Sequence, residues 1–126
     1  MNKSLKDRVG FKQSVKPGAY TSTQTGTGVD LQGYESAMLM IDSATITDGT
    51  HTPKLQESDD NSTFTDVAAA DQLGTLAAIA TTTPQKVSYI GGKRYIRAVV
   101  TVSGATTGGV YSAEILVGHA DQNPVS

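Results

Sequence analysis

The clearest strand pattern in the chain is Arg94-Tyr95-Ile96-Arg97-Ala98-Val99-Val100-Thr101-Val102. Successive side chains of a β-strand point to opposite faces of the sheet, so residues two apart share a face. One face of this segment carries Ile96, Ala98, Val100 and Val102. Because all four side chains are apolar, we expect this face to lie against a hydrophobic core.

A second alternating segment, residues 110–118, follows a glycine-rich loop at residues 104–109. Its apolar face carries Tyr111, Ala113, Ile115 and Val117, and its other face carries Ser112 and Glu114. A short loop with glycines between two alternating segments is typical of neighbouring antiparallel strands. The sequence therefore predicts that these two long strands pair with each other.

Shorter strand-length segments are separated by turn residues along the rest of the chain. Residues 36–42 are a nearly continuous apolar run, which is typical of a central strand buried on both faces. Residues 52–67 contain the clearest hairpin, with two strands around the acidic turn 59–62. Residues 68–73 predict a loop or one helical turn, and residues 85–90 predict another strand.

Six to eight short strands with turns between them indicate an all-β fold. We expect an antiparallel β-sandwich or barrel, of jelly-roll or immunoglobulin-like type, and the sequence does not choose between these topologies. The composition agrees, because only 17% of the residues are charged and thirteen are glycine. At 126 residues the chain has the size of one domain.

The N-terminal segment is basic. Half of the ten lysines and arginines lie in the first sixteen positions, and they are Lys3, Lys6, Arg8, Lys12 and Lys16. Residues 1–18 lack a sustained periodicity, so we expect an extended N-terminal arm there and the sandwich domain at residues 19–126. These five residues are the candidate partner-binding residues. Five spaced charges without a series of aromatic stacking partners are a weak basis for nucleic-acid binding, so a nucleic-acid partner is not expected.

The sequence predicts no catalytic, metal or cofactor site, and we expect a binding protein that is not an enzyme. Its two histidines, His51 and His119, have no second ligand at a metal-binding spacing, so we expect both at the surface. The turn at residues 59–63 resembles a calcium loop but has Phe64 in place of the loop glycine and Ala70 in place of the closing glutamate.

Two further features have simpler interpretations than a binding site. The glycines at residues 91–92 and 104–109 lie outside the nucleotide-binding patterns, so we interpret these segments as hairpin loops. The N-terminal residues have no signal-peptide core, and the chain has no apolar stretch of eighteen residues. We therefore expect no membrane partner.

Two parts of the chain resemble small proteins of tailed phages and prophages. Residues 49–67 are similar to a strand, an acidic turn and an aromatic-bearing strand of those proteins, and residues 92–111 are similar to their second half. The likeness covers residues 29–119. Such proteins are commonly encoded among head genes, so the resemblance implies a capsid decoration or cement protein.

The resemblance implies that the protein is made in the bacterial cytoplasm and lies on the exterior of the phage head. There it would bridge subunits of the major capsid protein as a homo-oligomer, a trimer by analogy, without a cofactor. Two alternatives remain. A head–tail connector or tail component would assemble rings or tubes, and a carbohydrate-binding module would need a platform of exposed aromatic residues, although the chain has no tryptophan.

Overall fold

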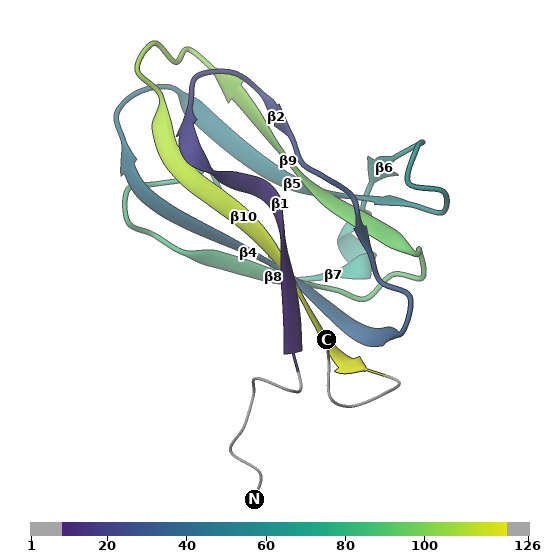
Figure 1. Ribbon diagram of the computed structural model, residues 1–126. Helices are drawn as coiled ribbons and strands as arrows, with labels where there is room; N and C mark the ends of the chain where they lie inside the picture. Colours follow the sequence, from purple (N-terminus) through teal and green to yellow (C-terminus); the bar gives the residue numbers. More distant parts are fainter. Residues whose placement is uncertain (1–8, 121–126) are drawn as a thin grey trace, which may run out of the picture.

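The computed structural model describes residues 9–120, and it describes side chains up to Gly118. Ten strands in this range form two antiparallel sheets that pack face to face (Figure 1). The sheets do not close into a barrel, so the predicted all-β sandwich is confirmed. Between Val9 and Ala120, no helix has the length and the apolar character needed to cross a membrane.

The sandwich consists of a β10 sheet and a β9 sheet, each named after its long strand. The β10 sheet has the order β1-β10-β4-β8-β7, with β1 at Val9–Tyr20, β10 at Gly109–Ala120, β4 at Tyr34–Ile46, β8 at Gln85–Tyr89 and β7 at Gln72–Leu73. The β9 sheet has the order β2-β9-β5-β6, with β2 at Gln24–Thr25, β9 at Tyr95–Ser103, β5 at Thr50–Ser58 and β6 at Thr65–Asp66. Strand β3, Val29–Asp30, also pairs with β9.

The strand pairs are nested. β1 pairs with β10, β2 and β3 pair with β9, β4 pairs with β8, and β5 pairs with β6. This pattern is one long antiparallel hairpin, with its tip at the β5–β6 turn, folded over into two sheets. With β2 and β3 taken as one strand and β7 added at an edge, it is the eight-stranded order of a jelly roll. The structure thus selects the jelly roll from the topologies that the sequence left open.

The core lies between the two sheets and is lined by alternate residues of the long strands. The faces predicted from the sequence are confirmed: the buried side chains include Ile96, Ala98 and Val100 of β9, and Tyr111, Ala113, Ile115 and Val117 of β10. Val102 packs partly buried against this cluster. Burial of these side chains removes apolar surface from water and is the main stabilising contribution to the sandwich.

The predicted pairing of residues 94–102 with residues 110–118 is wrong. β9 and β10 follow each other in the chain, but they lie in opposite sheets, and the loop between them crosses from one sheet to the other. Residues 91–92 likewise lead from β8 to β9 across the sandwich, so neither glycine-rich segment is a hairpin loop. Glycine favours the sharp reversal in both cases, since a crossing arch needs the same backbone freedom as a hairpin turn.

Other local predictions fare better. The hairpin within residues 52–67 is confirmed by the pairing of β5 with β6, and the predicted helical turn is a 3₁₀ turn at Ala69–Asp71.

Strand β4 is the central strand of its sheet, as residues 36–42 predicted, but it is buried on one face only. Leu39 and Ile41 face the core, whereas Met38 is half-buried and Met40 is 36% exposed on the outer face.

The expected boundary between an arm and the sandwich at residue 18 does not fit the described part of the chain. Residues 9–20 form β1, an edge strand of the β10 sheet that runs beside β10 in Figure 1. Ser14 and Val15 of this strand are buried. The Ser14 hydroxyl accepts a hydrogen bond from the Ala98 N–H (2.9 Å) and donates one to the Thr27 carbonyl (2.9 Å), which ties β1 to the opposite sheet.

Candidate partner-binding surfaces

The five predicted partner-binding residues fall into two groups. Lys3, Lys6 and Arg8 lie outside the described residues. Lys12 and Lys16 are exposed on β1, at the open edge of the β10 sheet. The pairing of β1 with β10 has register shifts on both sides of Val15, so these two lysines do not follow one regular alternation. Within residues 9–118, the structure therefore places a basic edge on the sandwich, with no compact basic cluster.

The outer face of the β10 sheet carries an apolar row that the sequence reading missed. The strand registers align five residues across the whole sheet, in the order Phe11, Leu116, Met38, Ser88 and Leu73. Phe11 is 68% exposed and Leu73 is 60% exposed at the two ends of this row. The alternation of β10 contained the necessary information, because Leu116 lies two residues after Glu114 and therefore shares the face opposite the core.

A second row runs beside the first. It aligns Gln13, Glu114, Met40 and Lys86 on β1, β10, β4 and β8. Between and beside these side chains is a shallow groove of about 700 Å³, to which Phe11, Leu116 and Pro84 also contribute. Five of the six large apolar side chains that are exposed in the described part of the chain lie on this face, and they are Val9, Phe11, Met40, Leu73 and Val110. Exposed apolar side chains gathered on one face make this face a candidate contact surface.

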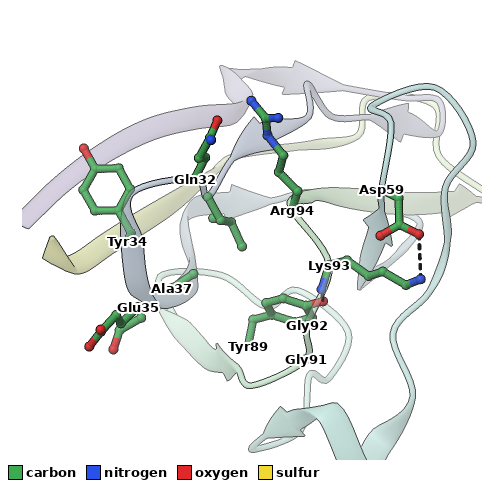
Figure 2. Close-up of a pocket in the computed structure, with 12 residues that line it drawn as sticks. Gln32, Tyr34, Glu35, Ala37, Asp59, Tyr89, Gly91, Gly92, Lys93 and Arg94 are labelled. Carbon is green, nitrogen blue, oxygen red and sulfur yellow. Dashed lines mark hydrogen bonds and ion pairs between the residues drawn. The ribbon is translucent and has the colours of Figure 1, made fainter. Parts of the chain in front are cut away.

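A smaller and more polar hollow, of about 340 Å³, lies where the residues before and at the start of β4 meet the β8–β9 connection (Figure 2). Tyr89 forms part of its wall. The Tyr89 hydroxyl donates to a Glu57 carboxylate oxygen (2.7 Å) and accepts from the Lys93 backbone N–H (2.9 Å). Burial and the Glu57 carboxylate raise the pKa of the Tyr89 hydroxyl, so it stays protonated and serves as a fixed hydrogen-bonding bridge.

Two basic side chains that line this hollow, Lys93 and Arg94, pair with aspartates. The Lys93 Nζ lies 2.8 Å from Asp59 Oδ2, as the dashed line in Figure 2 shows. The Arg94 guanidinium donates two hydrogen bonds to Asp30, at 2.9 and 2.8 Å. The two pairs attach the β8–β9 connection to the β5–β6 turn and to β3. The walls of the hollow are therefore held together by ion pairs within the chain.

The Asp30–Arg94 pair predicts a specific pH dependence. The Arg94 hydrogen bonds lower the pKa of Asp30 from 3.8 to about 2. The contribution of the ionised Asp30 to the free energy of unfolding is therefore complete above about pH 4, and it is lost as the pH falls towards 2. Both side chains are 40% or more exposed, so we expect Asp30→Asn to lower the free energy of unfolding at pH 7 by only about 0.5–1 kcal/mol.

Urea titrations of both proteins at pH 7, 4 and 2.5 measure this difference. The gap between wild type and Asp30→Asn should narrow at pH 2.5. A gap that stays constant across this range would contradict the assignment.

His51 is not at the surface, so that prediction is wrong. The ring is fully buried between the sheets, beside Tyr111. Its Nε2 lies 3.0 Å from the Asp48 carbonyl oxygen and its Nδ1 lies 2.9 Å from the Tyr111 hydroxyl. Because a carbonyl only accepts, Nε2–H is the donor and Nδ1 accepts from Tyr111. Both ring nitrogens are thus satisfied inside the core. The side chain of His119 lies outside the described side chains.

The carboxylate of Asp60 in the acidic turn, residues 59–62, is used within the turn itself, where it accepts hydrogen bonds from backbone N–H groups. Asp60 Oδ1 accepts hydrogen bonds from the N–H groups of Ser62 and Thr63, each at 2.9 Å, and from the Ser58 hydroxyl at 2.9 Å. These contacts lower the pKa of Asp60 and are the usual role of aspartate in a turn. Among the described residues, no three histidines, cysteines or carboxylates gather to form a candidate metal site.

Comparison with known proteins gives one informative likeness. No model of a known protein family matches the sequence, and no curated protein matches it. The SPBc2 prophage-derived protein YomS superposes with a TM-score of 0.55 at 16% identity, over 86% of this chain and 92% of that chain. A chain of infectious bursal disease virus, Gx strain, gives a TM-score of 0.45 at 13% identity over 93% of this chain, which spans 33% of the viral one. The likeness to YomS shows a shared fold.

Proposed function

We propose that this protein is a structural component of a tailed-phage virion that decorates the head and stabilises it by bridging subunits of the major capsid protein. The observation that carries the proposal is the outer face of the β10 sheet. Phe11, Met40 and Leu73 are exposed there on a rigid sheet, which suits a protein that functions in contact with other protein chains.

Two further observations support the proposal. The likeness to a prophage-derived protein extends over nearly the whole of both chains. The basic residues of the N-terminal segment continue onto β1, where Lys12 and Lys16 are exposed at the edge of the sandwich. An exposed edge strand with lysines resists pairing with other strands and leaves its charges available to an acidic surface. In this proposal the β1 edge contacts the capsid subunits.

The test is binding to expanded, undecorated capsids of a cognate phage, measured by sedimentation and electron microscopy. We expect saturable binding at symmetric positions on the shell. Removal of residues 1–8 leaves β1 intact and should weaken binding. The double variant Lys12→Ala/Lys16→Ala should raise the dissociation constant several-fold, and by at most about thirtyfold, since each exposed charge contact contributes at most about 1 kcal/mol.

The matched control is Lys54→Ala/Lys93→Ala, which also removes two positive charges but lies away from the β1 edge. Each of these lysines pairs with an aspartate in the same chain, so capsid binding should stay unchanged. Absence of binding to shells would contradict the proposal. Rings at a single vertex would instead support a connector, and retention on polysaccharide would support a carbohydrate-binding module.

A further inference from the structure

The two rows on the outer face of the β10 sheet have a symmetry that points to their partner. Strand β4 is the middle strand of five, and it contributes Met38 and Met40, the central residues of the two rows. On one side of Met40 lies Glu114, and on the other side lies Lys86. In the other row, the exposed Phe11 and Leu73 lie at equal distances of two strands from Met38.

We propose that this face binds the same face of a second copy of the chain, through a two-fold axis that runs parallel to β4, midway between the facing β10 sheets of the two copies. A 180° rotation about that axis keeps β4 opposite β4 and exchanges the two sides of the sheet. Glu114 then faces Lys86 of the second copy, and Lys86 faces its Glu114. Residue i contacts j and j contacts i, which is the pattern of an isologous interface.

The apolar row follows the same operation. Phe11 of one copy is placed over Leu73 of the other, so the two most exposed apolar side chains of this face cover each other. Met38 and Met40 meet their own counterparts at the axis, where flexible methionine side chains adapt to a close contact. The axis also suits the twist of the sheet, because this rotation carries a twisted sheet onto a parallel copy and keeps the two faces evenly spaced.

The charges favour a second copy over an unrelated apolar partner. Among the described side chains, neither Glu114 nor Lys86 has an ion-pair partner. A partner with a uniformly apolar surface would bury both charges unpaired, which is costly. A second copy presents a lysine to each glutamate without any additional feature. The row pattern thus favours a two-fold dimer over the trimer that the family resemblance implies.

This inference does not rest on the proposed function, although it gives that function a mechanism. A dimer built on the β10 sheet leaves the β1 edge of each copy at its periphery. The two edges are then related by the two-fold axis, and each is free to contact a different capsid subunit. Dimerisation is measured without capsids, so its failure and the failure of capsid binding are separate results.

The test is a charge exchange read by sedimentation velocity of the full chain at 1–100 µM. We expect wild type to dimerise. Glu114→Lys places lysine against Lys86 twice, and Lys86→Glu places glutamate against Glu114 twice. Each variant alone should dimerise at least about tenfold more weakly, because like charges facing each other across an interface repel. Matched thermal unfolding of the isolated variants confirms that both fold.

The decisive sample is an equimolar mixture of the two variants. One copy then carries lysine at both positions and the other carries glutamate at both, so the mixture should restore a dimer that contains one of each. Wild type that stays monomeric at 100 µM, or that forms trimers, would overturn the proposal. The proposal would also be overturned if each variant dimerised as strongly alone as in the mixture, since the pairing of Glu114 with Lys86 would then not contribute to the dimer.

Discussion

Replacing Gly108 with alanine is expected to lower the free energy of unfolding by about 3 kcal/mol or more. Gly108 lies in the arch between β9 and β10 at φ +85°, a conformation that L side chains rarely adopt. A Cβ there would collide with the backbone carbonyl of Tyr20, which is part of the edge strand β1. Urea denaturation followed by circular dichroism measures the effect.

The environment of Gly108 explains why relaxation is difficult. Its N–H donates to Asp48 Oδ1 (2.6 Å), and the same oxygen accepts from Thr106 N–H (3.0 Å) and Thr107 N–H (3.1 Å). These bonds lower the pKa of Asp48. The Gly108 carbonyl in turn accepts from the Thr47 N–H at 2.9 Å. The β9–β10 arch is thus fastened to the β4–β5 arch and cannot move alone.

Gly104 provides the matched control within the same arch. It also has a positive φ, +69°, but a Cβ there would meet no atom within 4 Å. Gly104→Ala should therefore cost only the backbone strain, about 1 kcal/mol. Equal losses for the two variants would show that the contact with Tyr20 is unimportant and that the left-handed backbone accounts for both.

The second large effect is expected for His51→Ala, which should lower the free energy of unfolding by about 3 kcal/mol. The substitution removes a fully buried ring and leaves the Tyr111 hydroxyl and the Asp48 carbonyl without their partner. Both costs add, because a cavity and an unsatisfied polar group remain in the core. Burial also raises the pKa of Tyr111 to about 12, so its hydroxyl remains a neutral donor at neutral pH.

Two variants separate these costs. Tyr111→Phe keeps the ring volume and removes only the hydroxyl, so we expect a smaller loss of about 1–2 kcal/mol. Thr52→Ala alters the exposed neighbour of His51 and should change stability by less than about 0.5 kcal/mol. If His51→Ala is as mild as Thr52→Ala, the ring does not contribute to the core in the way its contacts imply.

The strand faces were predictable from the sequence because they depend on local alternation. The apolar sets of residues 96–102 and 111–117 each share a face, and a period of two residues is sufficient to assign it. Sheet membership was not predictable, because a glycine-rich reversal between residues 103 and 109 suits both a hairpin and an arch between sheets. The nested pairing is decided by contacts between segments that are far apart in the chain.

The residues of the candidate surface were likewise only partly predictable, because their alignment depends on pairing between distant strands. Met38 and Met40 were assigned to a doubly buried strand, since a continuous apolar run does not reveal which of its faces is covered. Only the register of β4 against β10 and β8 shows that these methionines align with Glu114, Lys86 and the exposed end residues. His51 was assigned to the surface for a related reason: its two hydrogen-bond partners are three and sixty residues away, and the distant one is invisible to local pattern.

The nested order of the strands also has a consequence for how the chain acquires its structure. Strand β1 is the first described strand to leave the ribosome, and its neighbour in the sheet, β10, is the last. The β5–β6 hairpin can close early, since its strands are separated by a short turn. The outer pair must wait for the rest of the chain, and such long-range closure slows folding. The β10 sheet can therefore be completed only after β10 has been synthesised, and until then Phe11 and the other apolar residues of β1 remain without their neighbours.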